Sequence, residues 1–143
     1  MTERSFYQTL RKHLQPKGVH LQRIETSLVQ GVPDVNFCYQ GVEGWIELKS
    51  IGHRTGSGVF KVAHLRPSQY AWIKRRCRAG GLVWLLVKAG QDLVLVHGSR
   101  ISLIYRHEWP WDQVDKFAHV LSAPVDYDVL LAVLTNRHVV NDD

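Results

Sequence analysis

The strongest constraint on how this chain folds is a pair of β-prone runs joined by a glycine turn. Residues 35–40 (VNFCYQ) and 45–49 (WIELK) are rich in β-branched and aromatic side chains, and residues 41–44 (GVEG) between them are typical of a turn. We therefore predict an antiparallel β-hairpin over residues 35–49.

Three polar side chains should converge on this hairpin. Side chains alternate between the two faces of a strand, so Glu47 and Lys49 should project to one side while Ile46 and Leu48 face the core. Asp34 ends the segment GVPD, thirteen residues before Glu47, where the first strand begins. The start of one hairpin strand lies opposite the end of the other, so we expect Asp34, Glu47 and Lys49 to lie together.

This arrangement predicts metal-dependent cleavage of a phosphodiester bond. Two neighbouring carboxylates repel each other unless a cation lies between them, and such hard oxygen ligands suit Mg²⁺ or Mn²⁺. The ammonium of Lys49 can orient the attacking hydroxide or neutralise charge on the phosphorane. The alternative is that Asp34 only opens a turn after proline, while Glu47 and Lys49 decorate the wet face of a strand. The combined motif favours the catalytic interpretation.

These residues resemble the motif of the PD-(D/E)XK nuclease superfamily, with most similarity to the small resolvase-like and VRR-NUC-type nucleases often carried by phages. The resemblance covers about residues 2–97. It implies a restriction-endonuclease-like α/β fold, in which a mixed sheet is flanked by helices in the order αβββαβ. It also implies that Asp34, Glu47 and the main chain of Leu48 bind the metal and that Lys49 assists the water.

The remaining patterns agree with this order of elements. Thr2 can cap a first helix that continues to about residue 13, and Pro67 opens a second helix that continues to residue 78 before Gly80. Residues 51–65 are rich in glycine and polar side chains, which predicts a mobile loop. Further strands are predicted over residues 19–25, 82–87 and 93–97.

Members of this superfamily commonly place another acid on the first helix. Glu3 and Glu25 are the acidic residues that precede Asp34, and both are candidates for the catalytic set. An acid in the first turn also suits the helix dipole, and Glu25 could simply pair with Arg23. Gln69 resembles the glutamine that many of these nucleases place on the helix after the Glu-x-Lys motif.

The distribution of charge predicts a polyanionic substrate. Residues 1–98 contain 14 Lys and Arg against 6 Asp and Glu, whereas residues 99–143 contain 4 against 7. A basic surface of this kind suits contacts with phosphates. A solvated helix face remains the alternative for the basic residues of the second helix. The predicted DNA-binding residues are Arg54, Ser57, Lys61, Gln69, Lys74, Arg75, Arg76 and Arg78.

We expect residues 1–98 to form the nuclease core and residues 99–143 to form a C-terminal extension outside the resemblance. Helices are predicted there over residues 112–121 and 126–136. Their apolar stripe could pack on the core or build a dimer, and the extension could also enlarge the DNA surface. The sequence leaves these uses open.

The sequence as a whole therefore predicts a DNA endonuclease that requires Mg²⁺ or Mn²⁺. Its preference among junctions, flaps, nicks and plain duplex stays open, and RNA cleavage or a catalytically inactive DNA-binding module are the alternatives. A homodimer is expected by analogy. No apolar run is long enough to cross a membrane, and Cys38 and Cys77 suggest reduced thiols, so we expect a cytoplasmic protein of a bacterium or a phage-infected cell.

Overall fold

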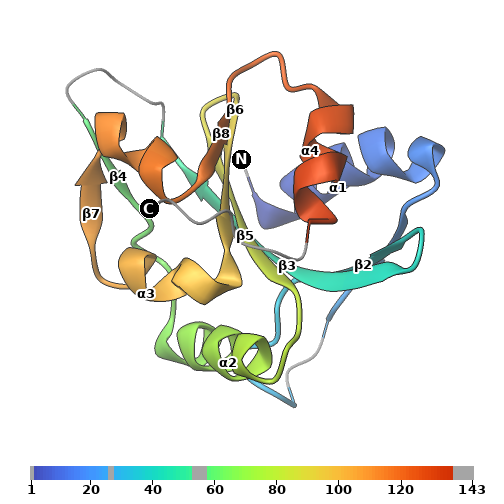
Figure 1. Ribbon diagram of the computed structural model, residues 1–143, viewed down its shortest axis with the longest axis horizontal. Coiled ribbons are helices and arrows are strands. Elements are labelled where there is room, and N and C mark those ends of the chain that lie inside the picture. The colour runs from blue at the N-terminus through green and yellow to red at the C-terminus, as the bar shows by residue number, and fades with distance from the viewer. Residues whose placement is uncertain (1, 26–27, 53–57, 137–143) are drawn as a thin grey trace.

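The computed structural model describes residues 2–25, 28–52 and 58–136, which form a mixed β-sheet with helices on both faces (Figure 1). Within these residues the main sheet has six strands in the order β1-β2-β3-β5-β6-β8, and β3 pairs with β5 in parallel. A separate two-stranded sheet joins β4 to β7. The strands are β1 His20–Arg23, β2 Val35–Tyr39, β3 Val42–Ile51, β4 Val59–Lys61, β5 Val83–Ala89, β6 Asp92–His97, β7 Glu108–Pro110 and β8 His119–Leu121.

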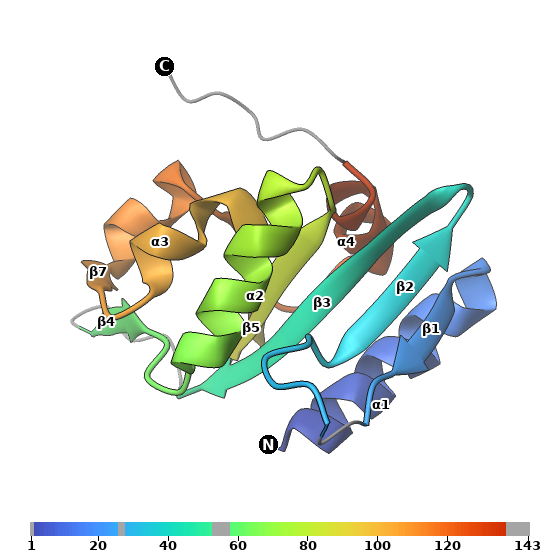
Figure 2. The same ribbon diagram turned by 90° about the horizontal axis from the view of Figure 1, so that it is seen from below.

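Four α-helices within the described residues surround the sheet, with α1 and α4 on one face and α2 and α3 on the other (Figure 2). Thr2 caps α1 as predicted, because its hydroxyl accepts a hydrogen bond from the Ser5 N–H at 3.1 Å. Pro67 is the first residue of α2, where its missing N–H has no helical partner to lose. The helices are α1 Glu3–Leu14, α2 Pro67–Arg78, α3 Ile101–Ile104 and α4 Tyr127–Leu134, and short 3-10 helices cover Gln15–Lys17, Gly98–Arg100 and Trp111–Lys116.

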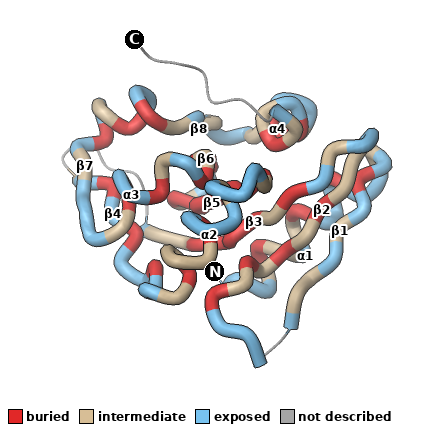
Figure 3. The backbone as a smooth tube through the Cα atoms, turned by 60° about the horizontal axis from the view of Figure 1, so that its bottom comes forward, coloured by how far each residue is buried: buried red, intermediate tan, exposed pale blue. Residues whose placement is uncertain are grey.

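The sheet separates two hydrophobic cores, and its central strands are buried along most of their length (Figure 3). Ile46 and Leu48 of β3 pack in the core formed with α1 and α4. Ile73 of α2 belongs to the other core, on the face to which Glu47 and Lys49 project. Because helices cover both faces, Glu47 and Lys49 are buried rather than directed to water.

The β2–β3 hairpin confirms the predicted pair of antiparallel strands, but its turn is tighter than expected and the register differs accordingly. Gln40 and Gly41 have φ values of +46° and +81°, as the two-residue turns that fit the twist of a hairpin require. As a result β3 begins at Val42, three residues earlier than predicted. The last pair of this ladder toward the site is Val35 with Ile46, so Asp34 lies at the level of Glu47.

Two predicted segments are corrected by the structure. Residues 51–65 are not a continuous loop, because β3 extends to Ile51 and β4 covers Val59–Lys61. The helix predicted over residues 112–121 is wrong, since a 3-10 helix covers Trp111–Lys116 and β8 follows it.

The C-terminal part of the chain packs on the rest of the molecule. β8 pairs antiparallel with β6, and α4 contacts α1. The indole Nε1–H of Trp84 on β5 donates a hydrogen bond to the Leu134 carbonyl at the end of α4, at 2.9 Å. None of the helices in the described part of the chain is long and apolar enough to span a membrane.

Candidate active site

Asp34 is fixed at the point where β2 begins. Its main-chain carbonyl accepts a hydrogen bond from the Ile24 N–H at 2.8 Å, and its Oδ2 accepts one from the Leu48 N–H, also at 2.8 Å. The N–H and C=O of a residue in a strand point to the same edge, so the Leu48 carbonyl is directed to the edge where Asp34 lies. The carboxylate of Asp34 therefore lies beside the main-chain carbonyl oxygen of Leu48.

Glu47 is the most deeply buried acid of the site, with 1% of its surface exposed. Its Oε2 accepts a hydrogen bond from Nε2 of Gln69 at 3.1 Å, whereas its Oε1 has no hydrogen-bond partner among the described residues. Burial, followed by the charge of Asp34, raises the pKa of Glu47 to about 9. A second positive charge near this carboxylate would therefore be strongly stabilising.

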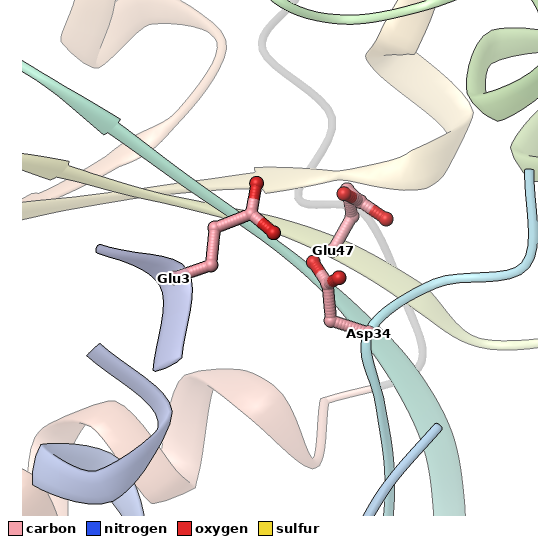
Figure 4. A group of neighbouring side chains, drawn as sticks. All are labelled: Glu3, Asp34 and Glu47. Atoms are coloured by element: carbon pink, nitrogen blue, oxygen red, sulfur yellow. The ribbon is translucent and has the colours of Figure 1, made fainter. Parts of the chain in front are cut away.

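Glu3 joins these two carboxylates from the first turn of α1. Figure 4 shows Glu3, Asp34 and Glu47 directed toward one another, and one carboxylate oxygen from each lies within 4.8 Å of the others. Partial burial and the charge of Asp34 raise the pKa of Glu3. Glu25 is not in this group: its exposed carboxylate lies 3.9 Å from Nε of Arg23.

Lys49 supplies the positive charge of the site and is 6% exposed. Its Nζ donates a hydrogen bond to the His64 carbonyl at 2.9 Å, and it lies 3.7 Å from Oε2 of Glu47 and 4.0 Å from Oε1 of Glu3. Pairing of this kind offsets the cost of burying an ammonium. Lys49 is thus held among the carboxylates with its ammonium directed at the same space.

Glu3, Asp34 and Lys49 line a cavity of about 490 Å³. Residues that sequence reasoning did not assign to the site line it as well. His64 and Arg66 line it, next to Pro67 and Gln69 at the start of α2. Their only signal in the sequence is their position just before the proline that opens the helix. Arg66 is exposed and therefore available to a ligand at the cavity mouth.

The predicted DNA-binding residues are distributed over more than this cavity. Gln69 is buried and holds Glu47. Lys61 is exposed on β4, whereas Arg54 and Ser57 lie outside the described residues. Exposed basic side chains continue along α2 away from the carboxylates, with Arg76 stacked over the rings of Trp45 and Trp72. The exposed residues of that run are Lys74, Arg75, Arg76 and Arg78.

The side chains present fit a hard divalent cation. Glu3, Asp34 and Glu47 offer carboxylate oxygens, and Oε1 of Glu47 is a buried acceptor that no described residue satisfies. Oxygen ligands of this kind suit Mg²⁺ or Mn²⁺, whereas zinc sites are usually built from His and Cys. The Leu48 carbonyl could complete such a shell.

No model of a known protein family matches this sequence, and no curated protein matches it either. Among solved structures, the fold is similar to that of Archaeoglobus fulgidus Hjc, a Holliday junction resolvase from an archaeal hyperthermophile. The two are 13% identical with a TM-score of 0.54, and the match covers 78% of this chain and 90% of that chain. This likeness confirms the predicted fold class, a mixed α/β sheet flanked by helices.

Proposed function

We propose that this protein is a DNA endonuclease that depends on Mg²⁺ or Mn²⁺. The observation that carries the proposal is the buried carboxylate of Glu47, for whose Oε1 the described part of the chain provides no geometrically satisfactory hydrogen bond. Asp34 and Glu3 surround it and Lys49 lies 3.7 Å from its other oxygen. Burying Glu47 and Lys49 beside two further carboxylates is costly for stability, which supports a functional use.

In the proposed reaction, Asp34, Glu47, Glu3 and the Leu48 carbonyl would hold the cation. A bound divalent cation would lower the pKa of a water and polarise a phosphate oxygen. Lys49 would orient the attacking water and offset negative charge on the phosphate; as the water oxygen bonds to phosphorus in line, the P–O bond to the leaving strand breaks and the proton of the water passes to solvent or to the leaving oxygen.

Other residues of the chain position the metal ligands or the substrate and do not contact the reacting atoms. Gln69 holds the Glu47 carboxylate through the 3.1 Å hydrogen bond, which restrains it beside the carboxylates of Asp34 and Glu3. Arg66 at the cavity mouth is placed to contact a phosphate of the strand. The basic residues of α2 extend this positive charge away from the site. They lie in a part of the chain with few acids.

For the substrate we propose branched DNA, with two copies of the chain presenting two sites. The support is that the structural neighbour is described as a Holliday junction resolvase and that residues 1–98 are strongly basic. Fold similarity supports function only by analogy, so the substrate has to be measured.

The test uses labelled four-way junction, flap, nicked, duplex and single-stranded DNA, with a matched RNA duplex. Each is incubated with the wild type in Mg²⁺, Mn²⁺ or EDTA, beside Glu47→Ala and Lys49→Ala. Glu25→Ala is the matched control, since Glu25 is exposed and outside the carboxylate group. We expect metal-dependent cutting of junction DNA that both site variants lose and the control retains.

Two outcomes would overturn the proposal in distinct ways. Tight DNA binding without cutting in any metal would indicate a recognition module. Preferential cutting of the RNA duplex would keep the chemistry and change the substrate class. Gel filtration with light scattering, at the concentration used for cleavage, would test the proposed dimer.

A further inference from the structure

Trp45 lies in β3 two residues before Glu47, and the two side chains project to the same face of the sheet. On this face α2 lies over β5 and β3, whereas no helix of the described residues covers β2 and β1 (Figure 2). Trp45 is half-buried at the border between the covered and the open part of the sheet. The proposed active site and the open face are therefore connected along one strand.

An arginine lies over two indole rings at this border. The guanidinium of Arg76 on α2 is 5.5 Å from the ring centroid of Trp45 and 5.6 Å from that of Trp72, and the two rings meet edge to face at 5.4 Å. Arg76 is exposed, but its side chain also passes close to Gly81, where an added Cβ would lie 2.8 Å from Arg76 Cγ. The guanidinium is thus held in place before any ligand binds, which lowers the entropy cost of binding.

Two amide side chains continue this row across the open strands. Trp45 pairs with Asn36 of β2, and Asn36 pairs with Gln22 of β1, so the three side chains share one face. Nδ2 of Asn36 donates hydrogen bonds to the Gly44 carbonyl at 3.1 Å and to Oε1 of Glu43 at 3.3 Å. These bonds use the donors of Asn36 and leave its Oδ1 as an acceptor for a ligand.

A flat ring with polar edges fits this surface better than a phosphate does. Aromatic rings and guanidinium planes hold bases by stacking, and amide side chains bind the edges of a base. The carboxylate of Glu43 beside Asn36 would repel a phosphate, whereas a base is neutral. Bases inside a duplex are covered by their neighbours in the stack, so the surface suits an unpaired base.

We propose that Trp45, Trp72 and Arg76 bind an unpaired base of the substrate strand by stacking. The inference rests on the proposed function, since it assigns a further part of the same substrate. Two residues of a β-strand span about 7 Å, and one strand of DNA rises about 3.4 Å per nucleotide, so the bound base lies about two nucleotides from the phosphate that is cut. The surface therefore favours DNA whose strands separate beside the cleaved bond.

Fluorescence anisotropy in EDTA measures binding without cleavage. The probes are a labelled hexathymidylate and a labelled abasic chain of the same length and charge, at constant ionic strength, so the ratio of their affinities reports the contribution of the bases. Arg76→Lys keeps the charge but removes the planar group, and Arg75→Lys is its control, since Arg75 is also exposed on α2. Trp45→Leu removes one ring, and Trp109→Leu is its control, since Trp109 is also half-buried but lies on β7.

We expect the wild type and both controls to bind the hexathymidylate about tenfold more tightly than the abasic chain, as stacking of one base on an aromatic ring supplies. Arg76→Lys and Trp45→Leu should lose most of this ratio and keep the affinity for the abasic chain. Circular dichroism shows whether Trp45→Leu folds, and if it does not, Arg76→Lys decides alone. An unchanged ratio in Arg76→Lys, or a wild type that binds both probes equally, would overturn the proposal.

The stacking surface and the nuclease function can fail separately. Metal-dependent cleavage without a base-dependent affinity would remove the stacking surface and leave the nuclease. A base-dependent affinity that Arg76→Lys loses, without cleavage in any metal, would support the stacking surface and remove the nuclease.

Discussion

Nε2 of Gln69 donates a hydrogen bond to Oε2 of Glu47 at 3.1 Å, across the space between α2 and β3. The other end of the Gln69 amide is also occupied, because its Oε1 accepts the Arg66 N–H at 2.9 Å. The start of α2 therefore fixes the side chain of Gln69, and Gln69 in turn fixes the carboxylate of Glu47. Residues far apart in the sequence are coupled by one amide, which makes the position of α2 part of the site.

Replacing Gln69 with leucine should weaken the site without removing a reacting group. We expect Gln69→Leu to lower kcat or the affinity for Mn²⁺ by about 10- to 100-fold, the usual cost of losing a residue that holds a metal ligand. The KM for DNA should change little. Titrating Mn²⁺ in the cleavage assay separates the two effects, since higher metal concentrations restore a loss of affinity alone.

Gln8→Leu is the control for this substitution, because Gln8 is exposed on α1. Gln69→Asn keeps the amide on a shorter side chain and should recover part of the lost activity. A Gln69→Leu variant with wild-type kcat and Mn²⁺ affinity would show that the hydrogen bond does not position Glu47.

Glu3 and Glu25 provide a matched pair for the metal site. Both are partly exposed acids on the N-terminal side of Asp34, but one carboxylate oxygen of Glu3 lies within 4.8 Å of those of Asp34 and Glu47. We expect Glu3→Gln to weaken Mn²⁺ binding by about tenfold, as loss of one charged ligand should, and Glu25→Gln to leave it unchanged. Calorimetric titration of each variant with Mn²⁺ would measure this, and equal affinities would exclude Glu3 from the shell.

The metal-free protein should lose stability as the pH rises. Folded Glu47 keeps its proton up to a pKa of about 9, whereas in the unfolded chain it loses the proton near the ordinary value of 4.5. Between these values the folded state binds more protons, so the free energy of unfolding falls as the pH increases. Tm measured in EDTA from pH 5 to 9 should therefore decline by several degrees more in the wild type than in Glu47→Gln.

Added Mn²⁺ provides the internal check on this pH dependence. It should raise the Tm of the wild type most at high pH, where the proton competes least with the metal. The Tm of Glu47→Gln should respond weakly at every pH. If the Tm of the wild type and of Glu47→Gln declined equally with pH in EDTA, Glu47 would not be the cause of the loss of stability.

The site could be predicted because its residues lie on one local element. A hairpin brings the start of one strand beside the end of the other, so the convergence of Asp34 and Glu47 could be expected, although their level was set by the tighter turn at Gln40 and Gly41. The choice between Glu3 and Glu25 could not be made in this way. It depends on how α1 packs against the sheet, and the sequence holds no local signal of that contact.

The C-terminal part of the fold could not be predicted from local patterns. Trp111, Val114 and Phe117 are buried at a spacing of three residues, which fits the three residues per turn of a 3-10 helix better than an α-helix. The pairing of His119–Leu121 with β6 is a long-range contact. Such contacts override local propensity, which is why the predicted helix over residues 112–121 does not form.

Gly31 offers a test of how the loop before Asp34 is fixed, with Gly41 as its control. Both glycines have similar left-handed φ values, +85° and +81°, so alanine strains the backbone equally at each. A Cβ on Gly31 would lie 2.1 Å from the Ser68 carbonyl oxygen on α2, whereas a Cβ on Gly41 meets nothing within 4 Å. We expect Gly41→Ala to lower the free energy of unfolding by about 1 kcal/mol and Gly31→Ala by about 3 kcal/mol, as backbone strain and overpacking add. Urea unfolding measures both free energies of unfolding. Equal losses would show that the loop before Asp34 can move away from α2 to make room for the added Cβ.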